Sequence, residues 1–401
     1  METRNITLLS IVTLLSLSLW FSASAVIPQL TLEWDLSSSM QAWMTMSVQI
    51  GFVAGALISA ILNLADKYSA PKLIAVSALF GAIVNALIPL VSTEPTSALT
   101  FRFLTGAAMA GVYPPAMKIM ASWSTKDRGK LIGLLVGAVV IGSGMPHLLN
   151  ALSTGATGVP PWRIVLYGTS IQALMGAIIS WFWITSGPHL GKASRFSWRH
   201  AAVGLTDKPT RLANFGYFGH MWELYAMWAW VPIMLLVSYQ NAGLPEHYAK
   251  YAAFGIFVAG GIGSYIAGIW ADKIGRTTIT SIALAISGVC CAIVGLFFNQ
   301  PILLTTICLI WGFAVVADSA QFSAAVSELA DPNYVGTALQ VQTSIGFLLT
   351  LVTLQVMPSL IANIGYEYAY IFLIPGPLVG IISMRRLKSH PRSLNMAFGN
   401  R

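Results

Sequence analysis

The sequence predicts an all-α membrane protein with twelve transmembrane helices in two six-helix bundles. Of its 401 residues, 56% are hydrophobic and only 9% are charged, whereas soluble domains carry about 25% charged residues to solvate their surface. Apolar runs long enough to cross a bilayer recur along the whole chain. Almost all Lys and Arg residues lie in alternate gaps between these runs, which is typical of membrane topology.

Twelve apolar runs are separated by short polar gaps. Each has the ~20 residues needed to cross a hydrocarbon core of about 30 Å. Because lipid offers no partner for unpaired backbone groups, continuous apolar runs predict helices. The first run ends in Ser22-Ala23-Ser24-Ala25, as a secretory signal does, but its length favours an uncleaved first helix. The predicted spans are residues 6–29, 41–63, 73–92, 97–121, 131–153, 164–186, 212–239, 251–270, 278–299, 301–327, 335–361 and 367–384.

The basic residues predict the orientation of these spans. With the N-terminus in the cytoplasm, eighteen of the 22 Lys and Arg residues fall in cytoplasmic segments, and only Arg163 and Lys250 fall outside. This positive-inside bias predicts that both termini are cytoplasmic. We therefore expect a multi-pass protein of the cell inner (plasma) membrane.

The longest internal gap, residues 187–211, is basic and separates six predicted spans from six. It predicts three parts: an N-terminal six-helix bundle at residues 1–186, a cytoplasmic linker at 187–211, and a C-terminal six-helix bundle with a short basic tail at 212–401.

The two predicted halves carry a matching motif. The gap after the second span and the gap after the eighth span both contain Ala-Asp-Lys, at residues 65–67 and 271–273. We expect Asp272 to cap the N-terminus of the next helix and the cations to pair with acidic groups of a neighbouring helix. Such contacts would form a conformational latch between the halves. The predicted latch residues are Asp66, Lys67, Gly268, Asp272, Lys273, Gly275 and Arg276.

The second copy of this motif, Gly268-x-x-x-Asp272-Lys273-x-Gly275-Arg276, resembles the cytoplasmic loop motif of the major facilitator superfamily. The first copy departs from it. The segment that begins with Arg102 and ends with Gly106 resembles the Arg-bearing fourth helix of the same superfamily. In the general character of its sequence, the chain is most similar to the anion-handling branch of the superfamily, which includes nitrate/nitrite and cyanate porters. The resemblance implies secondary active transport by alternating access, with substrate bound near the midplane between the halves.

Four charged residues lie in the interior of the predicted spans: Arg102, Lys118, Glu223 and Asp318. A charge at the bilayer centre costs about 2.5–3.5 kcal/mol on insertion scales, so each needs a physical reason. Lys118 is close enough to a helix end to reach the interface. Arg102 cannot release its proton, so it meets either an anionic substrate or a structural partner such as a carboxylate or a helix C-terminus.

Three residues form the predicted proton-coupling set: His220, Glu223 and Asp318. His220 and Glu223 are three residues apart and share a helix face. Desolvation favours the protonated form of a carboxyl group, and histidine exchanges protons near neutral pH. Asp318 would face Glu223 or pair with Arg102 or Lys118. The alternative is that these groups are buried hydrogen-bonded pairs that fix helix packing.

The predicted substrate contacts combine aromatic and polar side chains of several spans. Tyr113 follows Arg102 by about three helical turns, so a continuous helix would place both on one side. Tryptophans of the spans can stack on a planar substrate, although packing near the membrane interface also explains them. The predicted set is Arg102, Tyr113, His147, Trp20, Trp222 and Gln321.

These observations predict a proton-coupled symporter of a small, anionic organic or inorganic solute. We expect a monomer that binds small molecules, protons and lipid but no nucleic acid. The three cysteines lie in apolar runs, and no metal-ligand spacing, cofactor motif or catalytic motif occurs, so we expect no metal, no cofactor and no enzymatic activity. Two alternatives stay open: a proton-driven exporter of drugs or of metabolites such as siderophores, and a transporter-like membrane sensor.

Overall fold

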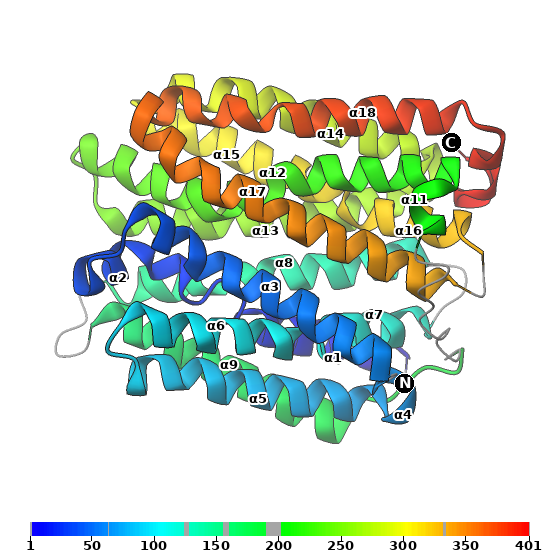
Figure 1. Ribbon diagram of the computed structural model, residues 1–401, viewed down its shortest axis with the longest axis horizontal. Coiled ribbons are helices and arrows are strands. Elements are labelled where there is room, and N and C mark those ends of the chain that lie inside the picture. Colours follow the sequence, from blue (N-terminus) through cyan, green and yellow to red (C-terminus); the bar gives the residue numbers. More distant parts are fainter. Residues whose placement is uncertain are drawn as a thin grey trace.

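The computed structural model describes residues 2–62, 64–123, 128–154, 160–189, 202–331 and 334–400. Within these ranges all regular structure is helical. The helices run side by side along the long axis of the molecule, and both chain ends lie at the same end of that axis (Figure 1). We call this end the terminal end. Residues 190–201 of the predicted linker lie outside the described residues.

The helices of the first half of the chain, residues 2–189, fill the lower part of Figure 1, and those of the second half, residues 202–400, fill the upper part. The first half contains α1 (Glu2–Leu17), η1 (Ser24–Val26), α2 (Ile27–Trp34), α3 (Ser38–Leu62), α4 (Leu64–Lys67), α5 (Ala70–Val91), α6 (Pro95–Met109), α7 (Tyr113–Ala121), α8 (Arg128–Leu152) and α9 (Pro161–Trp183). The second half contains α11 (Val203–Thr206), α12 (Lys208–Asn241), α13 (Glu246–Ile274), α14 (Arg276–Ile293), η2 (Val294–Phe297), α15 (Pro301–Ala317), α16 (Ser319–Leu329), α17 (Val335–Ala369), η3 (Tyr370–Leu373), α18 (Pro375–Lys388), η4 (Pro391–Asn395) and η5 (Ala397–Gly399).

Nine helical runs in the described part of the chain are long and apolar enough to cross a membrane. The last of them, Val335–Lys388, has 54 residues, which at ~1.5 Å per residue is far more than one crossing needs. Gly365 interrupts it with φ 76° and ψ 172°. This left-handed backbone suits glycine and separates the two predicted spans.

The first predicted span, residues 6–29, is not one helix. Helix α1 ends at Leu17, turns follow, and η1 and α2 continue the chain. The carbonyl groups of Leu19 and Trp20 accept hydrogen bonds from the Arg102 side chain. Because a side chain of another helix supplies these donors, the chain can leave the helical path without losing its hydrogen bonds.

The fourth predicted span is also broken, between α6 and α7. Gly111 and Val112 donate to carbonyl groups only three residues back, at 2.9 and 3.0 Å, which tightens the turn. Pro114 and Pro115 have no N–H groups to continue the helix, and they open α7 instead. The tenth predicted span is divided at Asp318, between α15 and α16.

Large apolar side chains are exposed on the outside of the molecule, whereas the charged residues Arg102, Glu223 and Asp318 of the predicted spans are buried. Ile302, Phe182 and Leu296 are exposed, while Arg102 and Asp318 are at most 1% exposed. Such a surface suits lipid and not water.

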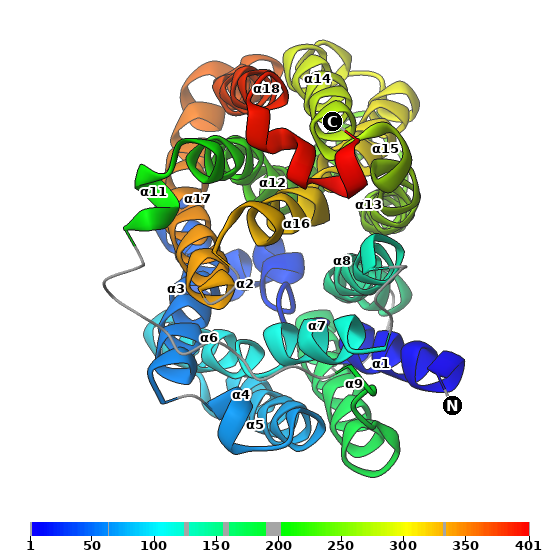
Figure 2. The ribbon, with the colours of Figure 1, turned by 90° about the vertical axis from the view of Figure 1, so that its right-hand side faces the viewer.

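Two helix pairs make the most extensive contacts between the halves of the chain: α8 packs against α13, and α3 packs against α17. The end-on view shows both contacts between the blue-to-teal and the green-to-orange helices (Figure 2). Glycines allow the close approach of α8 and α13. A Cβ atom on Gly137 would lie 2.8 Å from the Gly261 carbonyl oxygen, and one on Gly133 would lie 2.9 Å from that of Ser264. Small residues four apart are typical of close helix pairs in membranes.

Gly137→Ala is expected to separate α8 from α13. The new methyl group meets backbone, which cannot rotate away, so the free energy of unfolding should fall by about 1–3 kcal/mol. The measurement is Tm in detergent. Gly255→Ala in α13 is the control, because its Cβ would meet only the flexible Leu309 side chain, at 3.2 Å. Equal Tm values for the two variants would show that this helix contact is not tight.

Candidate functional site

A buried acid–imidazole contact lies in the second half of the chain. His220 of α12 and Asp318, between α15 and α16, are 0% and 1% exposed at their side chains, and His220 Nδ1 lies 2.9 Å from Asp318 Oδ1. This distance fits an ion pair. The rings of Tyr217 and Phe322 flank the imidazole, at 6.0 and 5.7 Å. A proton on this pair is therefore held in apolar surroundings.

Glu223 belongs to a second polar cluster. Its Oε2 accepts hydrogen bonds from Ser287 Oγ at 2.7 Å and Cys291 Sγ at 3.2 Å. Trp311 Nε1 in turn donates to Ser287 Oγ at 3.0 Å. The structure places Asp318 in contact with His220, which shares a face of α12 with Glu223.

Arg102 is buried, and its guanidinium group binds oxygens of the broken first span. Nη1 donates to the Leu19 carbonyl at 2.9 Å and to Ser22 Oγ at 2.8 Å, Nη2 donates to the Trp20 carbonyl, and Nε donates to the Met44 carbonyl at 3.3 Å. Four of its five N–H groups are therefore used. This geometry supports the structural alternative for Arg102.

A polar chain extends from Arg102 into the first half. Ser22 Oγ donates to Asn85 Oδ1 at 2.6 Å, and Asn85 Nδ2 donates to the Leu166 carbonyl at 2.9 Å and to Ser170 Oγ at 2.9 Å. Together with Arg102 these contacts fix the break in the first span against α5, α6 and α9.

Eight aromatic rings from both halves of the chain pack against one another. Trp20 contacts Phe52, Tyr225 and Phe347, at centroid distances of 5.1, 6.1 and 5.5 Å. His147 stacks on Phe257 at 5.4 Å. The rings form a continuous set of contacts, which we call the aromatic cluster. Its members are Trp20, Phe21, Phe52, His147, Tyr225, Trp228, Phe257 and Phe347.

Three predicted substrate contacts lie outside the aromatic cluster. Trp222 packs against Phe372, and its Nε1 donates to the Phe372 carbonyl at 3.2 Å. Gln321 Oε1 accepts a hydrogen bond from Arg276 at 2.7 Å, at the terminal end. Tyr113 opens α7, so the continuous face expected for Arg102 and Tyr113 is broken. Of the predicted set, only Trp20 and His147 share one cluster.

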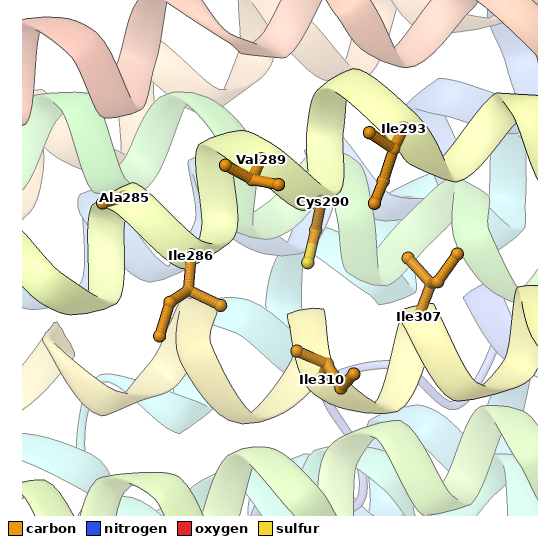
Figure 3. Close-up of a pocket in the computed structure, with 7 residues that line it drawn as sticks. All are labelled: Ala285, Ile286, Val289, Cys290, Ile293, Ile307 and Ile310. Carbon is orange, nitrogen blue, oxygen red and sulfur yellow. The ribbon is translucent and has the colours of Figure 1, made fainter.

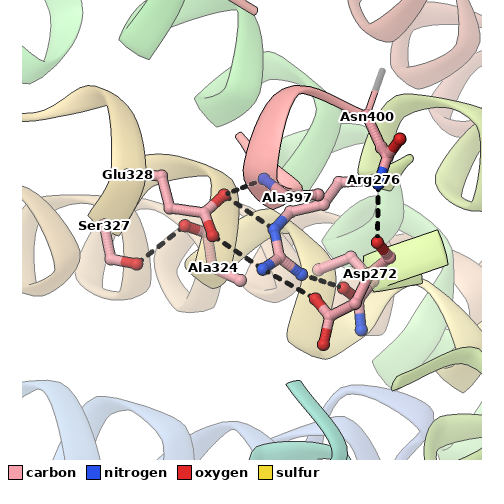
Figure 4. A network of polar contacts seen from close by, with 8 residues as sticks. Asp272, Arg276, Ala324, Ser327, Glu328, Ala397 and Asn400 are labelled. Atoms are coloured by element: carbon pink, nitrogen blue, oxygen red, sulfur yellow. Dashed lines mark hydrogen bonds and ion pairs between the residues drawn. The ribbon is translucent and has the colours of Figure 1, made fainter. Parts of the chain in front are cut away.

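Two predicted latch residues of the second half, Asp272 and Arg276, meet in one polar network, which we call the latch network (Figure 4). Arg276 donates to both oxygens of Glu328 at 2.7 Å, and its Nη2 lies 3.1 Å from Asp272 Oδ1. The expected pairing of a cation with an acidic residue of a neighbouring helix is thus present. The tail joins this network, because the Ala397 N–H donates to Glu328 at 3.2 Å and Asn400 Nδ2 donates to the Asp272 carbonyl at 2.9 Å.

Asp272 does not cap α14 as expected. That helix has Gly275 at its N-cap, with φ 98°, and no side-chain cap. A Cβ on Gly129 would lie 2.5 Å from Asp272 Oδ2, so this carboxylate sits beside the start of α8 in the other half. The positive end of the α8 dipole favours a negative charge there.

The remaining predicted latch residues take little part in the polar contacts described for this network. Gly268 allows close packing, since its Cβ would lie 2.8 Å from the Gly129 carbonyl oxygen. Lys67 and Lys273 are exposed. The side chain of Asp66 lies outside the described residues.

Arg276→Lys is expected to loosen the latch network. One ammonium group cannot reproduce the paired N–H donors that a guanidinium offers a carboxylate. Losing charged hydrogen bonds at this buried site should cost about 2 kcal/mol of stability, measured as a lower Tm. Arg385→Lys, at an exposed position of α18, is the matched control. A Tm equal to that of the control would contradict the network's role.

A separate cavity of about 360 Å³ lies between α14 and α15 (Figure 3). Its lining is aliphatic except for the thiol of Cys290, and Ile286 and Ile307 are part of it. With no polar group to orient a solute, it does not resemble a specific binding site.

Sequence reasoning missed several residues of these clusters. Glu328 falls one residue beyond the predicted end of the tenth span, so it was not counted among the buried charges. Asn85 is an uncharged polar residue inside a predicted span, a signal that could have identified it. The remaining aromatic rings give no such signal, because aromatic residues are common in membrane helices.

Solved structures share this fold. A D-xylose–proton symporter aligns with a TM-score of 0.77 over 97% of this chain and 98% of its own, at 14% identity. The xylose transporter XylE of E. coli, in a partially occluded inward-open conformation, aligns with a TM-score of 0.75 over 96% and 97% of the two chains, also at 14% identity. At this identity the likeness concerns the fold alone.

Curated relatives are similar over parts of the chain. A candidate niacin/nicotinamide transporter of Bacillus subtilis is 24% identical over 54% of this chain and 54% of its own length. Rat solute carrier family 22 member 12 is 27% identical over 42% of this chain and 31% of its own. A gallate transporter of Pseudomonas putida is 22% identical over 67% and 66%. The chain thus spans about a third to a half of the length of the first two.

The family model described as Major Facilitator Superfamily matches residues 9–354. This covers most of the chain, including the broken first span, Arg102, the aromatic cluster, and Asp272, Arg276 and Glu328 of the latch network. The protein is therefore a multi-pass membrane transporter, not an enzyme, and it belongs to the major facilitator superfamily.

Proposed function

We propose that this protein is a secondary active transporter that moves a small organic anion across the inner membrane by alternating access, coupled to protons. In this proposal the chain crosses the membrane twelve times with cytoplasmic termini and works as a monomer. Residues 1–186 and 212–401 form two six-helix bundles joined by the linker 187–211. The position of both chain ends at one end of the long axis supports an even number of crossings (Figure 1).

The His220–Asp318 contact carries the proposal of proton coupling. Both side chains are buried in the second half, at a depth where a charge is costly and where ionisable groups commonly mark ion or proton pathways. A proton gained by this pair changes its net charge by one. Glu223, with its hydroxyl and thiol donors, is a second buried proton site in our proposal.

The relatives support an organic anion as solute. The names of two relatives specify niacin/nicotinamide and gallate. Niacin and gallate each carry a carboxylate at neutral pH. None of the three relatives described above is a nitrate, nitrite or cyanate porter, so the proposal does not single out the nitrate/nitrite/cyanate branch.

A second candidate function is proton-driven export of an aromatic drug or metabolite. Two observations favour it: the rings of the aromatic cluster are largely apolar, and Arg102 is bound to backbone carbonyl groups. Import and export use the same fold and differ in the direction that the gradients impose.

The test uses proteoliposomes and labelled niacin, gallate and xylose under an imposed pH gradient of either sign. We expect an organic anion to accumulate above its equilibrium level with the gradient of one sign, and a protonophore to abolish this. Selective labelling of the tail identifies the orientation of the protein and hence import or export. Absence of uphill movement of either anion under both gradients would overturn the proposal, and equal accumulation by Glu223→Gln would exclude Glu223 from coupling.

A further inference from the structure

The aromatic cluster lies where the two halves of the chain meet. Trp20 and Phe52 from the first half contact Phe347 of α17, at 5.5 and 4.9 Å. Phe21 contacts Trp228 of α12 at 5.8 Å. If the halves move apart in alternating access, these contacts are the ones that open, and the rings become the two faces of a site.

Four buried nitrogen atoms in and beside this cluster have no hydrogen-bond partner among the described residues. They are Trp20 Nε1, Gln49 Nε2, His147 Nε2 and Trp228 Nε1. Their residues are at most 4% exposed. Gln49 lies one helical turn from Phe52, and its Oε1 accepts a hydrogen bond from Thr350, one turn from Phe347. The amide oxygen is therefore used, while the amide N–H groups are free.

The unpartnered nitrogen atoms can all donate hydrogen bonds. Indole and amide nitrogens only donate hydrogen bonds, and only the imidazole nitrogen of His147 can either donate or accept. Leaving a donor unpaired in a dry site costs free energy, so the site favours a ligand that brings acceptor atoms. A sugar hydroxyl offers a donor with each acceptor, whereas a carboxylate offers acceptors alone.

The aromatic side chains of the cluster indicate which group the rest of the ligand should carry. Faces of Trp20, Tyr225 and Trp228 favour stacking on another planar ring. No full countercharge is needed, because N–H donors can hold a carboxylate in a site from which water is excluded. Arg102 is not available for this purpose, since four of its N–H groups bind oxygens of the chain.

We propose that the aromatic cluster is the substrate site and that it takes a small planar aromatic carboxylate, with the ring between aromatic side chains of both halves and the carboxylate on the free N–H donors. This inference rests on the proposed function and narrows its solute class.

The test compares three probes on the purified full-length protein: benzoate, cyclohexanecarboxylate and benzamide. Binding is measured by the increase in Tm with ligand concentration. We expect benzoate to bind most tightly, with each of the other two about tenfold weaker, because one lacks the planar ring and the other the charged acceptor. Equal affinity for all three probes would overturn the inference.

Variants test the donor role separately from the ring. Trp228→Phe keeps a ring and removes one free N–H, so benzoate affinity should fall about tenfold while benzamide affinity changes less. Trp222→Phe is the matched control, because its N–H is bound to the Phe372 carbonyl outside the cluster. Unchanged benzoate affinity in a folded Trp228→Phe protein would contradict the donor role.

Transport separates the two proposals. Proton-driven accumulation of gallate or niacin by a protein that does not bind benzoate in preference to cyclohexanecarboxylate would overturn the inference and leave the proposed function intact. Benzoate binding without uphill movement of any solute under either pH gradient would overturn the proposed function and leave the inference about the binding site intact.

Discussion

Asp318→Asn is expected to abolish proton-driven accumulation while leaving exchange of substrate across the membrane intact. Asparagine can neither take up nor release a proton, but its size and its amide oxygen still suit the contact that Asp318 makes with His220 at 2.9 Å. The accumulation ratio under a pH gradient should fall to about 1, because solute movement would no longer be linked to a proton. Counterflow, which needs no net proton movement, should continue.

The measurement pairs two assays on one preparation of proteoliposomes: uptake driven by a pH gradient and counterflow of labelled solute at equal pH. Asp35→Asn is the matched control. It makes the same chemical change at an exposed position with φ 49°, a conformation that asparagine tolerates. Full accumulation by Asp318→Asn would remove Asp318 from the coupling mechanism. Loss of both activities would indicate that the carboxylate holds the structure instead.

The sequence predicts the membrane class and the position of most helices because lipid preference is a property of each residue. Apolar runs therefore mark the helices wherever they are continuous. The break in the first span after Leu17, unlike the apolar runs, has no cause in the local sequence. It depends on donors from Arg102, which is far away in the sequence, and no local pattern reports such a contact. The break before Tyr113 has a local cause in Pro114 and Pro115 and could have been predicted.

The partners of buried polar groups are the least predictable feature. Helical spacing shows that His220 and Glu223 are neighbours on one helix, but it does not show which helices pack against them. In the structure Asp318 contacts His220, and Ser287 binds Glu223. Gln321, a predicted substrate contact, binds Arg276. These outcomes are set by the packing of helices, which periodicity alone does not determine.

The membership of the aromatic cluster also depends on how the helices pack, which the sequence alone does not show. Trp20 and His147 were predicted as substrate contacts from their residue types, and both lie in the cluster. Tyr225 and Phe347 complete it from the other half of the chain. Tertiary structure is needed to show which of the chain's many aromatic residues meet.

Arg102→Gln is expected to weaken binding of charged and neutral ligands equally. In the structure the guanidinium group holds the carbonyl groups of Leu19 and Trp20, and Trp20 carries a ring of the aromatic cluster. Glutamine has one NH₂ group and a shorter side chain, so several buried carbonyl groups would lose their donor. At roughly 1–3 kcal/mol for each unsatisfied group, the free energy of unfolding should fall by about 3 kcal/mol.

The ratio of affinities decides between the two roles of Arg102. If the guanidinium group contacted the carboxylate of the substrate, Arg102→Gln would weaken benzoate binding and spare benzamide, because only the charged ligand would lose its partner. If Arg102 positions the segment that carries Trp20, both affinities should fall by the same factor, together with Tm. Arg163→Gln is the matched control, since Arg163 is 41% exposed at its side chain and lies 3.8 Å from Glu33. A selective loss of benzoate binding would return Arg102 to direct anion recognition, and the buried carbonyl contacts would then belong to only one state of the transport cycle.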